Sequence, residues 1–108
     1  MTLQVTISNP RSPGRCTTID ATVDVNHPIA ILPRALVEEL GLSDSYATFR
    51  REGHSSIASF SVSEDANGAV LGLSTLMGLL LEVDRGTGQL RPFEPLLLLA
   101  SPLLTPVT

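Results

Sequence analysis

Aromatic residues and cysteine are scarce in this chain of 108 residues, which has no tryptophan, one tyrosine, three phenylalanines and one cysteine. Hydrophobic residues nevertheless make up 43% of the chain, so the predicted core is built from leucine, isoleucine and valine. The lone Cys16 excludes a disulfide within the chain and a metal site made of several cysteines. This composition is typical of an aliphatic globular domain and not of a disordered segment.

Basic residues are few as well. Seven of them stand against eleven acidic residues, which gives a net charge of -4. The largest basic cluster is the pair Arg50-Arg51, so the sequence lacks the electrostatic footprint that binds phosphate backbones. We therefore expect no nucleic acid among the partners.

Long hydrophobic runs are absent. The longest wholly apolar run covers residues 96–100, far below the roughly 18 residues that a membrane-spanning helix needs. The N-terminal residues enter an alternating pattern at once, without the basic stretch and apolar region of a secretory signal. The sequence therefore predicts a soluble, cytoplasmic protein that does not associate with membranes.

What the chain does contain is alternation at the period of a β-strand. Leu3, Val5 and Ile7 alternate with polar residues, and a turn rich in proline and glycine follows at residues 9–14. The alternation resumes over residues 17–25, with Val25 placed on the apolar side, which predicts a hairpin. A second apolar pair, Ile29 and Ile31, is expected to restart a strand.

Two short helices are expected. Pro33 suits the first turn of one helix, and Gly41 provides its C-terminal stop. Ser74 is a good N-cap for the second helix, over residues 75–80. Between them, residues 46–62 predict one or two strands joined by a turn at Gly53. Further short strands are expected at residues 70–72, 81–83 and 89–91, so the chain is predicted to be a mostly β domain.

Several segments together resemble the retropepsin-like (clan AA) aspartic proteases. Members of that family carry a strand ending in Val-Asp-Thr-Gly-Ala, then an apolar-Leu-Pro segment and a helix, and later an apolar-Leu-Gly segment. The corresponding segments here are VDVNH (23–27), ILP (31–33), LGL (40–42), VLG (70–72) and VDRGTGQL (83–90). The resemblance runs from about Val5 to Pro92. It implies a closed β-barrel of the acid-protease fold with one or two short helices, over residues 1–94.

The resemblance also implies a function and a partner. In the family, each subunit of a homodimer contributes one aspartate, and the two carboxylates share a proton and polarise the water that attacks a peptide bond. Asp24 matches this catalytic position. The expected partners are a second copy of the chain and a peptide or protein substrate, and the family requires no cofactor.

The residues around Asp24 depart from the family pattern. Val25 replaces a threonine whose hydroxyl bonds across the family dimer, and Asn26 replaces a glycine that allows close approach of the substrate. His27 completes the motif. These changes predict impaired or lost catalysis, so the alternative function is a non-catalytic peptide-binding or dimerisation module. Without the resemblance, Asp24 reads as a residue that caps a turn, and His27 as a turn residue.

The substrate-covering flap of the family has a weak counterpart. The turn at residues 51–54 resembles the flap turn, which makes Gly53 and His54 candidate substrate-binding residues, although His54 alone reads as a solvated loop residue. The two histidines and Cys16 lack the spacing of metal ligands, so no metal site is expected. The apolar tail, residues 95–108, is expected either to cover the core of its own domain or to form a strand of the dimer interface. A third hypothesis is a structural domain that uses this tail in a larger assembly.

Overall fold

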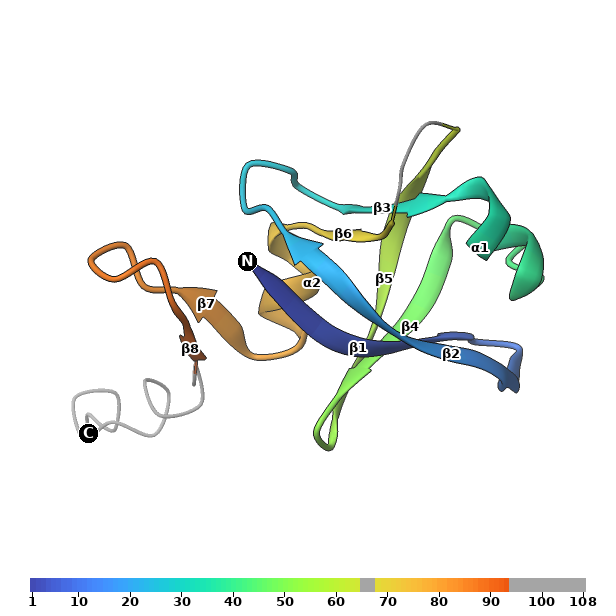
Figure 1. Ribbon diagram of the computed structural model, residues 1–108. Coiled ribbons are helices and arrows are strands. Elements are labelled where there is room, and N and C mark those ends of the chain that lie inside the picture. The colour runs from blue at the N-terminus through green and yellow to red at the C-terminus, as the bar shows by residue number, and fades with distance from the viewer. Residues whose placement is uncertain (65–67, 94–108) are drawn as a thin grey trace, which may run out of the picture.

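The computed structural model describes residues 1–64 and 68–93, so the predicted role of the tail at 95–108 lies outside the described residues. Strands dominate, and two six-residue helices interrupt them (Figure 1). No helix in the described part of the chain is long and apolar enough to cross a membrane. The elements in chain order are β1 (Thr2–Asn9), β2 (Ser12–Val23), β3 (Ala30–Pro33), α1 (Arg34–Glu39), β4 (Tyr46–Arg51), β5 (His54–Ser63), β6 (Val70–Leu71), α2 (Leu73–Gly78), β7 (Leu81–Val83) and β8 (Leu90–Pro92).

Six strands form a closed ring in the order β1, β2, β6, β3, β5, β4. The predicted hairpin is confirmed, because β1 and β2 pair antiparallel from Thr2↔Thr22 to Ser8↔Cys16. Two pairings in the ring are parallel: β2 with β6, and β3 with β5. In the first of these pairings, β6 joins only Thr22 and Val23, the last two residues of β2. This pairing fixes the point where β2 ends.

The buried core is formed by strands of the ring together with α1, α2 and β7, and it is aliphatic except for two phenylalanines, as the composition predicts. The alternation predicted for β3 has the wrong phase, however. In β3 the fully buried side chains are those of Ala30 and Leu32, whereas Ile29 and Ile31 are only partly buried. Val25 is also 40% exposed, because β2 ends at Val23 and the chain then turns. The period-two pattern does not survive that turn.

The first helix ends as the sequence predicts but begins one residue later. Pro33 is extended and acts as the N-cap, so it closes β3 and lies outside α1. At the other end Gly41 has φ +65°, and the N–H groups of Gly41 and Leu42 donate to the carbonyls of Glu38 and Val37. This Schellman arrangement requires a left-handed residue, which glycine adopts at no steric cost.

The second helix begins at Leu73 and has Gly72 as its N-cap, so the predicted capping by Ser74 is wrong. No side chain caps this helix. Its first N–H groups are instead satisfied by backbone carbonyls of the turn that follows β2: Leu73 donates to His27 (N···O 2.8 Å) and Ser74 donates to Pro28 (3.0 Å). A helix end capped from a distant part of the chain gives no local sequence signal.

The predicted turn at Gly53 is confirmed, and it joins two strands, β4 and β5. Both central residues of the turn have positive φ, Glu52 at 46° and Gly53 at 85°, which is the type I′ pattern of tight hairpins. The last two strands, β7 and β8, form a separate two-stranded sheet beside the ring (Figure 1).

Candidate functional site

Asp24 is the first residue after β2, and its backbone is fixed from both sides. Its N–H donates to the carbonyl of Leu71 at the end of β6 (3.0 Å), and its carbonyl accepts the N–H of His27 (3.2 Å). The first bond continues the parallel β2–β6 pairing, and the second closes a tight turn. The position of the carboxylate is therefore set by the sheet rather than by a loose loop.

The carboxylate oxygens of Asp24 have different surroundings. Oδ1 accepts the backbone N–H of Asn26 (3.0 Å), whereas Oδ2 lies 3.4 Å from Nε2 of His27. The side chain of Asp24 is 38% exposed and that of His27 is 46% exposed. The structure thus brings together three of the predicted motif residues, Asp24, Asn26 and His27, at a surface that other molecules can reach.

Gly72 makes this turn possible. A Cβ atom built at Gly72 would lie 2.4 Å from the carbonyl oxygen of Ile29 and 2.7 Å from that of His27. Both contacts are with backbone atoms that cannot rotate away. Since the carbonyl of His27 also accepts the N–H of Leu73, the strand β6, Gly72 and α2 together clamp the Asp24 turn. The glycine of the Leu-Gly pair in the sequence motif is therefore needed because no side chain fits at that position.

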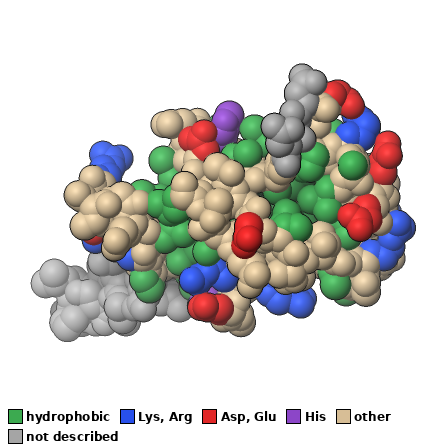
Figure 2. All heavy atoms as spheres, in the orientation of Figure 1, with side chains coloured by type: hydrophobic (Ala, Val, Ile, Leu, Met, Phe, Trp, Pro, Cys, Tyr) green, Lys and Arg blue, Asp and Glu red, His purple; other side chains and the backbone are tan. Residues whose placement is uncertain are grey.

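Val25, the remaining residue of the motif, lines an apolar groove of about 340 Å³ between α2 and the β7–β8 sheet. Figure 2 shows hydrophobic atoms reaching the surface where α2 and β7 lie. Two further exposed residues line this groove, Leu73 (45% exposed) and Met77 (50%). The sequence analysis did not identify either residue as part of an exposed surface. Their i, i+4 spacing was the available signal, because it defines a second face beside the buried Leu76.

Gly53 and His54 lie at the other end of the strands. They belong to the β4–β5 turn, which is at the bottom of Figure 1, whereas the end of β2 and the loop that follows it lie in the upper half. Within residues 1–64 and 68–93, no hydrogen bond or ion pair joins this turn to Asp24. These two candidate substrate-binding residues therefore form no such contact with the aspartate within one copy, and their role in substrate binding stays a prediction.

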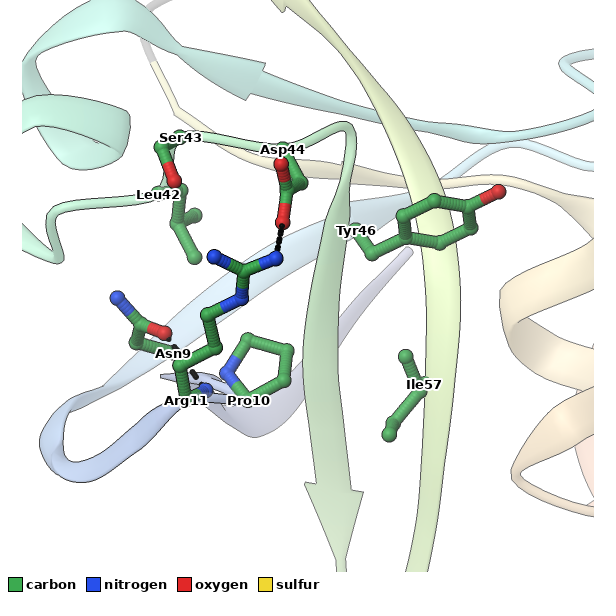
Figure 3. Close-up of a pocket in the computed structure, with 8 residues that line it drawn as sticks. All are labelled: Asn9, Pro10, Arg11, Leu42, Ser43, Asp44, Tyr46 and Ile57. Carbon is green, nitrogen blue, oxygen red and sulfur yellow. Dashed lines mark hydrogen bonds and ion pairs between the residues drawn. The ribbon is translucent and has the colours of Figure 1, made fainter.

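A second pocket, of about 210 Å³, is formed by the β1–β2 turn and the segment between α1 and β4. In Figure 3 the guanidinium of Arg11 points toward the carboxylate of Asp44, and the two form an ion pair of 2.9 Å across this pocket. Tyr46 and Ile57, from β4 and β5, lie beside it. None of the Asp24 motif residues lines this pocket.

Among the described residues, no group of three or more histidine, cysteine, aspartate or glutamate side chains is placed to hold an ion. Near Asp24, the structure offers two such side chains, those of Asp24 and His27.

No protein-family model and no curated protein matches the sequence. Among solved structures, the chain is similar to the retroviral protease-like domain of Ddi1 from Leishmania major, with a TM-score of 0.57 and 18% sequence identity. The match covers 85% of this chain and 86% of that domain. The fold is retropepsin-like. This confirms the expected fold class, and at such low identity the likeness concerns the fold alone.

Proposed function

We propose that this retropepsin-like domain acts as a homodimeric aspartic endopeptidase, in which the Asp24 carboxylates of two copies activate one water molecule. The observation that carries the proposal is the placement of Asp24: it directly follows β2, its Oδ1 is held by the Asn26 N–H, and its side chain is 38% exposed. Two like charges brought close together cannot both ionise freely. One carboxyl then keeps a proton as the acid while the other serves as the base.

The surface beside Asp24 supports a second copy of the chain as the partner. Val25, Leu73 and Met77 are apolar and at least 40% exposed, and they surround the groove next to the aspartate. A domain of about 100 residues gains stability by covering such a surface. A twofold interface uses the same patch on both copies, so the patch that covers this groove also brings the two Asp24 residues toward each other.

A second candidate function is a non-catalytic module that dimerises and binds an extended peptide. Two observations favour it. Val25 has nearly the shape of threonine but no hydroxyl, so it cannot make the hydrogen bond that the family forms under its carboxylates, and an unpaired partner group costs about 1 to 3 kcal/mol. In addition, within the described residues of one copy the β4–β5 turn forms no hydrogen bond or ion pair with Asp24, so one copy alone shows no contact that closes the site against water.

Cleavage of a diverse peptide mixture between about pH 3 and 7, the range over which carboxyl groups titrate, separates these functions. We expect the wild-type chain to cleave and Asp24→Asn to be inactive. Asp20→Asn is the matched control, since Asp20 is an exposed aspartate of β2, the strand that ends just before Asp24. The double variant Val25→Thr/Asn26→Gly should cleave faster than wild type.

The other outcomes are equally informative. A silent wild type combined with an active Val25→Thr/Asn26→Gly variant supports the binding module, because the scaffold is then competent and only the chemistry is switched off. Cleavage that persists in Asp24→Asn overturns the aspartic mechanism. Light scattering on the same samples tests the dimer, and a monomer at all concentrations contradicts both functions.

A further inference from the structure

We propose that His27 selects the substrate, so that the domain prefers extended peptides with an acidic side chain next to the bond that faces Asp24. The inference rests on the proposed function, because it names the class of peptide that binds at that site. Nε2 of His27 lies 3.4 Å from Oδ2 of Asp24. A peptide whose carbonyl group reaches a water molecule held by Asp24 therefore has its neighbouring side chains within reach of the imidazole.

The imidazole of His27 is accessible to such a peptide. Its side chain is 46% exposed. Val25, on the same turn, lines the apolar groove beside α2, whereas His27 does not line it. The proposed contact between two copies thus lies on the Val25 side of the turn, and the His27 side remains for the substrate.

The backbone of His27 is held independently of its side chain. Its N–H donates to the carbonyl of Asp24 (3.2 Å), and its carbonyl accepts the N–H of Leu73 (2.8 Å). A Cβ atom at Gly72 would lie 2.7 Å from the same carbonyl oxygen, so this segment is closely packed. Because these contacts involve only the backbone of His27, replacing its side chain tests the imidazole and leaves the turn in place.

Asp24 is the only acidic side chain that contacts His27 in the described part of the chain. The elements clamped against the turn, β6 and α2, contain no charged side chain, and residues 28–31, which follow the turn, contain none either. The carbonyl of Met1 accepts the N–H of Val23 (2.9 Å), so the N-terminal amino group, which is positive at acidic pH, lies near the end of β2.

The neighbouring groove adds no free negative charge. Glu82 and Arg85 both line it. Glu82 forms an ion pair with Arg91 (2.6 Å), whereas Arg85 has no ion-pair partner among the described residues. The unpaired charge on this side of the turn is therefore positive.

The charge of the proposed dimer site follows from these groups. Two Asp24 carboxylates that share one proton carry a single negative charge. Two protonated His27 side chains carry two positive charges, so the site as a whole is positive at acidic pH. A glutamate or aspartate of the substrate is attracted there, whereas a lysine or arginine is repelled.

The selection should depend on pH in both directions. At about pH 5.5 a glutamate side chain is ionised while a histidine side chain still binds its proton. The preference for glutamate over glutamine should be largest there. It should fall toward about pH 7.5, where histidine loses its charge, and toward about pH 3.5, where glutamate becomes neutral.

The test uses the full chain and pairs of labelled apolar peptides that carry either glutamate or glutamine at one central position. Fluorescence anisotropy measures binding, and chromatography measures cleavage, both at about pH 5.5. We expect the wild-type chain to bind, and to cleave, the glutamate peptide about threefold better, as an exposed ion pair allows. The ratio should approach one in about 1 M NaCl, because salt screens exposed charges.

Variants separate the charge of the imidazole from its shape. His27→Gln should remove the preference for glutamate, whereas His27→Lys, which keeps a positive charge, should retain it. His54→Gln is the matched control and should leave the ratio unchanged, because His54 belongs to the β4–β5 turn. Asp24→Asn should bind the glutamate peptide with a larger preference than wild type, because it removes the opposing negative charge. Circular dichroism shows whether each variant is folded.

The outcomes distinguish this inference from the proposed function. A wild-type ratio near one, or a ratio that survives His27→Gln, overturns the inference. Cleavage without any preference overturns it too but leaves the proposed function standing. Binding that prefers glutamate without cleavage contradicts the peptidase and supports the inference for a peptide-binding module. A wild-type chain that neither binds nor cleaves any of these peptides contradicts both.

Discussion

Two aspartates of this chain follow a valine at the end of a strand, Asp24 after β2 and Asp84 after β7. Both form the same local turn. Oδ1 of Asp24 accepts the N–H of Asn26 (3.0 Å), and Oδ1 of Asp84 accepts the N–H of Gly86 (2.7 Å). The two residues thus share a sequence motif and the carboxylate bond to the N–H two residues later, but one belongs to the candidate site and the other does not.

The second oxygen separates the two aspartates. Oδ2 of Asp84 forms an ion pair with Arg91 (3.0 Å), which also binds Glu82 and locks the β7–β8 hairpin. The backbone N–H groups of Gly86 and Thr87, aided by Arg91 and partly opposed by desolvation, lower the pKa of Asp84 below its ordinary value of 3.8. Oδ2 of Asp24 faces a histidine, and no arginine lies within ion-pair distance among the described residues. The carboxylate of Asp84 is therefore neutralised by an arginine and helps to hold a hairpin. The carboxylate of Asp24 has no arginine partner among the described residues.

The largest expected effect on stability comes from disturbing Gly72, which supports the Asp24 turn but not the Asp84 turn. Gly72→Ala should lower the free energy of unfolding by about 3 kcal/mol, because its Cβ would overlap the backbone carbonyls of His27 and Ile29. Urea denaturation measures this change. Gly68→Ala is the control, since a Cβ there meets nothing within 4 Å, and its effect should stay within about 1 kcal/mol.

Equal stabilities of the two glycine variants would contradict the steric account of the Asp24 turn. A further check uses the second aspartate. In Gly72→Ala, the amide exchange rate should increase more at Asp24 than at Asp84. The N–H of Asp24 bonds to Leu71, whereas that of Asp84 bonds to Gln89.

A smaller effect is expected from neutralising each aspartate in turn. Asp84→Asn should lower the thermal midpoint at neutral pH, because asparagine still accepts backbone N–H groups but loses the charge that faces Arg91. Asp24→Asn should leave the midpoint nearly unchanged, because the amide oxygen can accept the Asn26 N–H and no arginine is lost. Thermal unfolding of both variants beside wild type measures the difference.

The pH dependence of the Asp84 effect follows from the direction of its pKa shift. A carboxyl whose pKa is lower in the folded state stabilises the protein above its unfolded pKa, and this stabilisation is lost as pH falls through the folded value. The gap between wild type and Asp84→Asn should therefore be constant near neutrality and close as pH falls through and below 3.8. A gap that widens on acidification would show that the shift has the opposite sign.

Most elements of the fold could be predicted from local patterns. Alternation located the β1–β2 hairpin, and Gly41 and Gly53 marked a helix end and a turn, because positive φ restricts the choice of residue at those positions. The phase of β3 and the capping of α2 could not be predicted. Both depend on the turn after Val23, which shifts the strand register and places the carbonyls of residues 27 and 28 against a helix more than 40 residues later.

The candidate site was predictable only in part. The resemblance identified Asp24 with its neighbours, but the exposed apolar pair Leu73 and Met77 was missed, because burial of a helix face depends on what packs there. The pairing of Oδ2 was equally hidden. Nothing local in the two Val-Asp segments indicates that Arg91, seven residues after Asp84, folds back onto it, whereas His27 lies beside Asp24.

The smallest expected effect tests the arginine that makes Asp84 structural. Arg91→Gln removes the ion pairs with Glu82 and Asp84, both at an exposed surface where such pairs contribute little. Amide exchange at Asp84 should become modestly faster, whereas exchange at Asp24 should not change. Because salt screens exposed charges, the difference between wild type and Arg91→Gln should shrink in about 1 M NaCl. A difference that is independent of salt would mean that Arg91 acts by packing, and the contrast between the two aspartates would then depend on shape rather than on charge.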